Sequence, residues 1–171
     1  MTPEAVSIHA PPFLSNPPYA ALIKDFLSTG VIEPAPALPE NPGLLEFKAG
    51  EFTCSVFPLE GELQVVIQSD VMRLDQLTVE QAQAASMLLH GLNWAARVGN
   101  GTMAMIDAHG TVVVAKTIEI QRLDGKRLGE EMAAVLEAAE NLAPVVKGSP
   151  RPPHSSASPP AASPLDIHRY A

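Results

Sequence analysis

The chain has 171 residues, enough for one compact domain with a sizeable core, and its formal net charge of −8 argues against nucleic acid or an anionic membrane as a partner. Cys54 is the single cysteine, which excludes an intrachain disulfide and a cysteine-based zinc site and fits a reducing compartment. The N-terminus lacks the pattern of a secretory signal and no stretch approaches about 18 consecutive apolar residues, so we expect a cytoplasmic protein.

The first predicted element is a helix between Asn16 and Gly30. Asn16 suits the N-cap, Pro17 suits the first helical position, and Gly30 suits the position that follows the C-cap. The apolar residues of this segment recur at helical spacing and share one face: Tyr19, Leu22, Ile23, Phe26 and Leu27. We expect residues 1–16 to form a flexible N-terminal arm ahead of the folded domain.

Three short antiparallel strands are predicted next, because apolar and polar residues alternate with a period of two. The alternating apolar positions are Leu45 and Phe47, then Phe52, Cys54 and Val56, and then Leu63, Val65 and Ile67. Turns are expected at Ala49-Gly50 and at Glu60-Gly61. Each predicted strand has one apolar face that needs a cover.

A long helix is predicted after these strands. Thr78 and Gln81 match a capping box, in which each side chain bonds the backbone N–H of the other residue. Met87 and Trp94 fall outside the main apolar stripe, so this helix is apolar on two sides. A second apolar face has to be covered by something other than the core beneath the first.

A hairpin and a final helix complete the folded domain. Residues 102–115 alternate around a predicted turn at Asp107–Gly110, and a helix is expected from Asp124 until Pro144 ends it. The predicted order is α-β-β-β-α-β-β-α, a two-layer α+β fold in which an antiparallel sheet is packed with helices across residues 17–147. We expect the Pro/Ser-rich residues 148–171 to be disordered.

Residues that could perform chemistry are few. Asp107 and His109 lie together and leave open an enzyme with a small pocket, although both fall in a predicted tight turn, where Asp commonly bonds nearby backbone. His90 has no carboxylate or second His one helical turn away, and Cys54 reads as a small core residue. We therefore expect no enzyme, and no catalytic, cofactor or metal site.

This element order is similar to that of the type III secretion chaperones of the Tir chaperone (CesT-like) family, over roughly residues 17–147. The positions that carry the resemblance run from the middle helix to the final one: Asn93, residues 103–106, 107–110 and 112–114, and the helix 128–142. The resemblance implies a bacterial, cytoplasmic homodimer without cofactors. It would bind the N-terminal region of a secreted virulence effector, keep that region non-globular, and deliver it for secretion.

Two surfaces follow from this resemblance and from the apolar patterns. The middle helix and the strand after it are the predicted dimer interface, through Ala85, Met87, Leu88, Trp94, Met103 and Met105. The first helix and the strands beside it are the predicted effector-binding patch, through Tyr19, Leu22, Ile23, Phe26, Phe52, Val56 and Phe57. Phe57 falls on the strand face opposite Phe52 and Val56, so one of these faces should lie near solvent.

Two alternatives remain open at this point. The tail could contact the secretion ATPase, but its composition equally suits an inert extension. The whole domain could also be a non-catalytic interaction or regulatory module of the same fold with no role in secretion.

Overall fold

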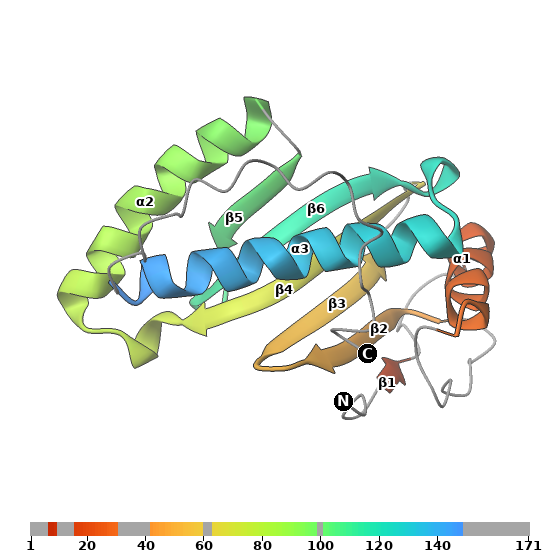
Figure 1. The fold of residues 1–171 in the computed structure, drawn as a ribbon, viewed down its shortest axis with the longest axis horizontal. Helices are drawn as coiled ribbons and strands as arrows, with labels where there is room; N and C mark the ends of the chain where they lie inside the picture. The colour runs from red at the N-terminus through yellow and green to blue at the C-terminus, as the bar shows by residue number, and fades with distance from the viewer. Residues whose placement is uncertain (1–6, 10–15, 31–41, 60–62, 99–100, 149–171) are drawn as a thin grey trace, which may run out of the picture.

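The computed structural model describes residues 7–9, 16–30, 42–59, 63–98 and 101–148, and of residues 7–9 and 91–98 it describes the backbone only. It forms one antiparallel sheet with helices packed against it (Figure 1). The strands are β1 (Ser7–His9), β2 (Leu44–Ala49), β3 (Phe52–Pro58), β4 (Gln64–Arg73), β5 (Thr102–Ile106) and β6 (Thr111–Glu119). The helices are α1 (Pro17–Ser28), α2 (Val79–Val98) and α3 (Gly125–Val146), with short 3-10 turns at Leu74–Gln76 and Ile120–Arg122.

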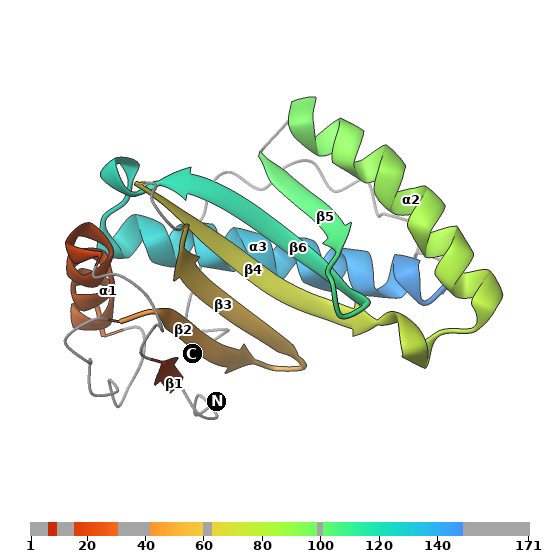
Figure 2. The same ribbon diagram turned by 180° about the vertical axis from the view of Figure 1, so that it is seen from behind.

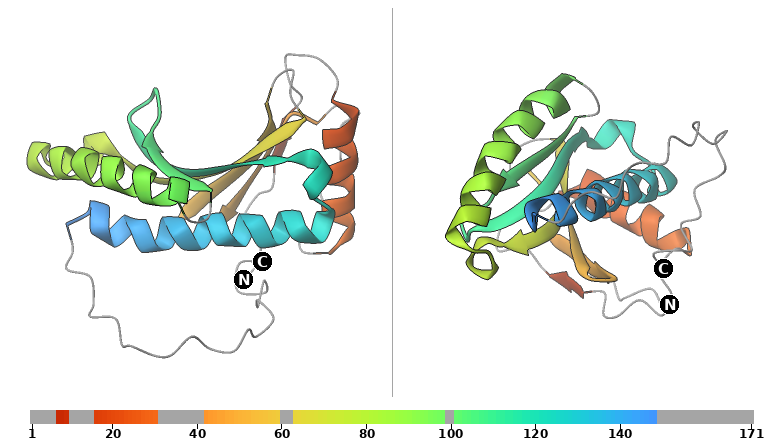
Figure 3. Two further views of the ribbon diagram at one scale, coloured as in Figure 1. Left: turned by 90° about the horizontal axis from the view of Figure 1, so that it is seen from above. Right: turned by 60° about the vertical axis from the view of Figure 1, so that its left-hand side comes forward.

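The six strands lie in the order β1-β2-β3-β4-β6-β5. Helix α3 runs across one face of the sheet, α1 stands at one end, and α2 lies beside β5 (Figure 1). Seen from behind, the opposite face carries no described helix (Figure 2). The β5–β6 hairpin curls away from α3 (Figure 3). The predicted α+β class with an antiparallel sheet is confirmed, and the sheet has one covered and one open face.

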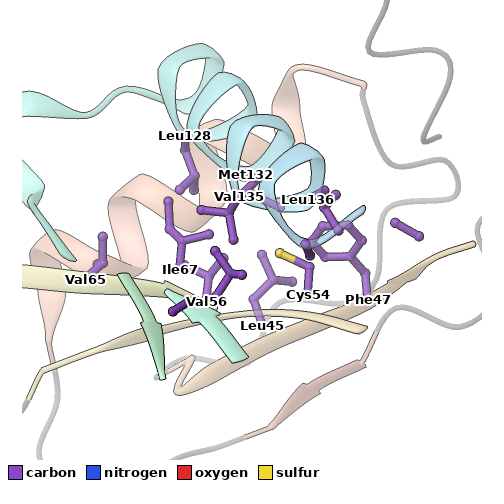
Figure 4. Close-up of a cluster of buried hydrophobic side chains, with 14 of the residues drawn as sticks. Leu45, Phe47, Cys54, Val56, Val65, Ile67, Leu128, Met132, Val135 and Leu136 are labelled. Carbon is purple, nitrogen blue, oxygen red and sulfur yellow. The ribbon is translucent and has the colours of Figure 1, made fainter. Parts of the chain in front are cut away.

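The core lies between α3 and the covered face of the sheet (Figure 4). The sheet contributes the alternating residues that the period of two predicts, and the helix contributes one stripe. The buried members that Figure 4 labels are Leu45, Phe47, Cys54, Val56, Val65, Ile67, Leu128, Met132, Val135 and Leu136. The scarcity of aromatic residues, 5% of the chain, leaves this core mostly aliphatic.

The sequence signals at both ends of α1 and at the start of α2 are confirmed. Asn16 Oδ1 accepts the backbone N–H of Tyr19 at 3.1 Å, and Gly30 has a φ of 73°, the left-handed conformation in which glycine is favoured. The capping box of α2 also forms, since Gln81 Oε1 accepts the Thr78 N–H at 2.9 Å and Thr78 Oγ1 accepts the Gln81 N–H at 3.3 Å.

The strand bounds differ from the prediction in the middle of the sheet. Strand β4 begins at Gln64 and continues to Arg73, well beyond Ile67, with a register irregularity between Asp70 and Met72. Leu63, predicted as an apolar strand position, precedes the strand and is 50% exposed. The longer strand follows from its partner, because β6 pairs along the whole of β4 and satisfies its backbone groups.

The final helix also differs from the prediction, because Pro144 does not end it. The helix continues to Val146, and the backbone N–H of Lys147 still bonds the carbonyl of Ala143 at 3.1 Å. A proline removes one backbone donor. Here the buried side chains of Leu142, Ala143 and Val146 hold the last turn in place, so tertiary packing overrides the local signal.

The largest difference concerns residues 1–16, predicted to be a flexible arm. Within them, Ser7–His9 form β1 and pair with β2, which adds a strand to the predicted element order. Residues 1–6 and 10–15 of that arm, the expected turn at Glu60-Gly61 and the tail from residue 149 lie outside the described residues.

Candidate functional site

The carboxylate of Asp107 forms hydrogen bonds within the hairpin turn between β5 and β6. Its Oδ1 accepts the backbone N–H groups of Thr111 and His109, each at 2.8 Å, and Gly110 closes the turn with a φ of 75°. The bond from the Thr111 N–H is the main reason why the pKa of Asp107 lies below its ordinary value. The turn interpretation is confirmed, and the hypothesis of an acid–base pair with His109 loses its main support.

Among the described residues, the remaining groups with reactive side chains neither gather into a cluster nor lie in an activating environment. Among the described residues, no three His, Cys, Asp or Glu side chains gather into a group that could hold a metal ion. Cys54 is buried, and burial raises the pKa of its thiol far above the ordinary value, so the sulfur stays protonated and unreactive.

Helix α1 is fixed to the rest of the molecule by two hydrogen bonds. The Tyr19 hydroxyl donates to the carbonyl oxygen of Val56 in β3 at 2.7 Å, and Asp25 Oδ2 accepts the Gly125 N–H at 2.6 Å. The second bond places a carboxylate at the N-terminus of α3, where the helix dipole favours negative charge. A side chain at Gly125 would come within 2.6 Å of the α1 backbone at Asp25 and Phe26.

This docking corrects the predicted effector-binding patch. Five of its seven members are at most 5% exposed and belong to the core: Tyr19, Leu22, Ile23, Phe26 and Val56. They were predicted from an apolar helix stripe, but a stripe does not reveal whether the chain's own sheet or a partner covers it. Phe52 is partly buried against the same core. Phe57 alone lies on the open face of the sheet.

That open face carries an apolar cross-strand pair on β3 and β4. Phe57 pairs with Val66, and Val66 with Thr117, in adjacent strands. Both Phe57 and Val66 are partly exposed. The sequence could have indicated this apolar surface, because Val66 is apolar at a position where the alternation of β4 predicts a polar residue.

The same face is also apolar at its β5–β6 end. Met103 pairs with Ala115 and Met105 with Val113. Val113 is only 1% exposed although no described helix covers this face, while both methionines are partly exposed. The sequence indicated the burial of Val113 through the continuous apolar run at residues 112–115, since a strand that is apolar on both faces is typically buried on both.

Helix α2 is held at its first turn and leaves one side uncovered. Gln81 Nε2 donates to the carbonyl oxygen of Lys147 at 3.1 Å, which joins the start of α2 to the end of α3. Ala85 and Leu89 are buried. On the other side Val79 is 74% exposed and Met87 is 78% exposed, unusually high for large apolar side chains.

The residues of the predicted dimer interface therefore fall into two groups, one packed in the core of the chain and one at its surface. Ala85 is 2% exposed in the core of its own chain, which corrects its assignment, and Leu88 is partly buried against that core. Met87 projects from α2, and Met103 and Met105 lie on the open sheet face. The side chain of Trp94 lies outside the described residues.

No described helix is long and apolar enough to cross a membrane. A comparison with protein families matches residues 21–143 to the Tir chaperone protein (CesT) family. A comparison with curated proteins finds no match.

Among solved structures, the chain is similar to one in the crystal structure of the ExsC–ExsE complex, with a TM-score of 0.59 and 15% identity over 75% of this chain and 92% of that one. It is similar to a chain of the HopA1–SchA chaperone–effector complex, with a TM-score of 0.59 and 14% identity over 74% and 93%. A third, from the ExoT–SpcS complex of Pseudomonas aeruginosa, has a TM-score of 0.48 and 17% identity over 73% and 97%. At these identities the first two likenesses show a shared fold.

Proposed function

The chain belongs to the Tir chaperone protein (CesT) family, and from this premise we propose that it is a type III secretion chaperone that binds the N-terminal region of an effector protein. It keeps that region non-globular and hands it to the secretion apparatus. A chain of similar fold occurs in the HopA1–SchA chaperone–effector complex. We further propose that the protein acts in the bacterial cytoplasm, without a cofactor and without catalysis.

The observation that carries the proposal is the open, partly apolar face of the sheet. An antiparallel sheet with one free face normally places polar residues there. Here the cross-strand pair Phe57–Val66 stands on that face and is partly exposed. An extended segment that lies across the strands can seat its own apolar side chains on this pair and so remain unfolded while its apolar surface is shielded.

The buried residues of the predicted patch have a supporting role in this proposal. The hydrogen bond from the Tyr19 hydroxyl to the Val56 carbonyl fixes the position of α1 relative to β3. Phe57 is the next residue of that strand. A rigid strand below a surface side chain lowers the entropy lost when a client binds. Client contact is therefore assigned to Phe57 and Val66 rather than to the α1 stripe.

We propose that the protein is a homodimer with a two-fold interface on α2 and β5. The exposed Val79 and Met87 and the partly exposed Met103 and Met105 supply apolar area from these two elements. Trp94 follows Met87 by seven residues, close to two helical turns, and stays part of the proposed interface. A stable dimer buries roughly 1,200–2,000 Å² in total, and in this proposal β5 adds to the area that α2 supplies.

The test of client binding is Phe57→Asp, with Thr53→Asp as the matched control on the same strand and the same open face. Each purified chaperone variant is titrated with the N-terminal segment of an effector, and complex formation is measured by calorimetry. We expect Phe57→Asp to weaken binding at least tenfold, about 1.4 kcal/mol, with the melting temperature of the free chaperone nearly unchanged.

Two results would contradict this assignment. Equal binding by the wild type and Phe57→Asp would remove the Phe57–Val66 pair from the client surface. Equal losses for Phe57→Asp and Thr53→Asp would mean that an added charge anywhere on this face disturbs the complex. Contact between the tail and the secretion ATPase remains a proposal about residues outside the described ones.

A further inference from the structure

The edge of the sheet at β2 is occupied by a short piece of the chain's own N-terminus. Ser7, Ile8 and His9 pair antiparallel with Glu46, Leu45 and Leu44. On its other side, β2 pairs with β3 from Leu45 to Ala49. Among the described residues, therefore, Phe47 to Ala49 have a strand partner on one side only. Strand β1 covers the first half of an edge that is twice its length.

A strand of this kind is easily replaced. An edge strand presents unpaired N–H and C=O groups that accept any extended chain, and longer pairing gains more backbone hydrogen bonds. Strand β1 has three residues and is joined to the N-cap Asn16 by the six residues 10–15. Such a short connection holds it near the edge at an effective concentration on the order of millimolar. It can therefore occupy the edge without being fixed there.

We propose that Ser7–His9 is a resident strand that occupies the β2 edge in the free protein and is displaced by an extended segment of the client. This inference rests on the proposed function, and it adds a competitor within the chaperone itself. While β1 is in place, it shields Leu44 to Glu46 from pairing with the edge of another copy. When a client pairs along the whole of β2, β1 is released, so the affinity of the protein for its client is reduced by the fraction of molecules in which β1 is docked.

Two variants of the full chain fix β1 in its two states. Successive N–H groups of a strand point to opposite sides, so either Ser7 or Ile8 donates toward β2. The double variant Ser7→Pro with Ile8→Pro removes that donor in either case and so opens the edge. Ser7→Cys with Glu46→Cys locks β1, because paired Cα atoms lie about 4.5–5.5 Å apart, within disulfide range. The native Cys54 is buried and does not compete for the bond. Glu4→Pro with Ala5→Pro and Glu46→Cys alone are the controls.

The first probe is a free peptide of residues 1–12 of this chain, titrated to about 2 mM and followed by NMR, a range that matches the effective concentration of the tethered strand. We expect shifts of the Leu44, Leu45 and Glu46 amides in the opened variant and none in the oxidised locked variant until a reductant is added. No shift in the opened variant, or equal shifts in both, would overturn the proposal. So would a disulfide that joins two chains instead of closing within one.

The second probe is the effector segment used to test the proposed function. We expect the opened variant to bind it about tenfold more tightly than wild type, and the oxidised locked variant to bind more weakly and recover on reduction. Equal affinity in all forms would show that the client does not use this edge, which overturns the inference and leaves the proposed function standing. Absence of client binding in every form would count against the proposed function, and the peptide titration would still decide whether β1 is displaceable.

Discussion

Helices α1 and α2 both carry apolar residues, but α1 buries its apolar face in the core and α2 buries only part of its apolar surface. Helix α1 buries Tyr19, Leu22, Ile23 and Phe26 and is tied by hydrogen bonds to both β3 and α3. Helix α2 buries Ala85 and Leu89 on one side and leaves Val79 and Met87 in solvent on the other. The difference teaches that α1 belongs to the folding core, whereas α2 keeps large apolar side chains in solvent, on the surface for which we propose a partner.

The largest effect is expected where α1 meets α3. Gly125→Ala places a Cβ 2.6 Å from backbone atoms of Asp25 and Phe26, which cannot move aside as a flexible side chain can. We expect the free energy of unfolding to fall by about 2–3 kcal/mol, measured by urea denaturation.

Gly129→Ala is the matched control on the same helix. Its Cβ would meet only the Phe26 ring, at 3.5 Å, an ordinary contact, and alanine favours the helix by roughly 0.5–1 kcal/mol over glycine. If Gly125→Ala were as stable as Gly129→Ala, the close docking of α1 on α3 would be wrong.

A smaller effect is expected from Tyr19→Phe, which removes the hydroxyl bonded to the Val56 carbonyl but keeps the ring. The loss should be about 1–2 kcal/mol, because a buried bond is removed without opening a large cavity. Thermal denaturation of the two proteins measures it. A change within about 0.3 kcal/mol would show that α1 does not depend on this bond.

The difference in stability between wild type and Tyr19→Phe should also depend on pH. Burial raises the pKa of its hydroxyl above the ordinary value of 10.0. The native state therefore requires the protonated form, and the contribution is fully present below about pH 10 and lost as the pH rises above it. Between pH 9 and 11 we expect the stability of wild type to fall more steeply than that of Tyr19→Phe. Parallel curves would contradict a buried, neutral Tyr19.

Local signals predicted much of this fold, because their partners lie close in sequence. The Asn16 cap, the Thr78–Gln81 capping box and the Asp107 turn each depend on residues at most four positions apart. The alternation of the strands likewise placed Cys54, Val65 and Ile67 on strand faces that need a cover, and all three are buried. Each of these features was confirmed.

What could not be predicted depends on distant partners. Strand β1 has too few residues to show a period, and it is a strand only because the β2 edge lies beside it. The continuation of α3 past Pro144 follows from packing of its last turn. The burial of the α1 stripe was not predicted for the same reason. Helix α1 is held by the hydrogen bond from the Gly125 N–H to the Asp25 carboxylate, and these two residues are 100 positions apart.

The most direct test of the account is the mass of the full chain in solution, by light scattering behind size-exclusion chromatography at micromolar concentration. Met87→Glu is compared with Ala134→Glu, which adds the same charge at an exposed position of α3. Because Met87 is 78% exposed in the single chain, neither change should alter the stability of the folded monomer by more than about 0.5 kcal/mol. We predict twice the chain mass for wild type and Ala134→Glu and a single chain for Met87→Glu. A monomeric wild type, or a Met87→Glu variant that remains dimeric, would contradict the claim that α2 is the partner surface.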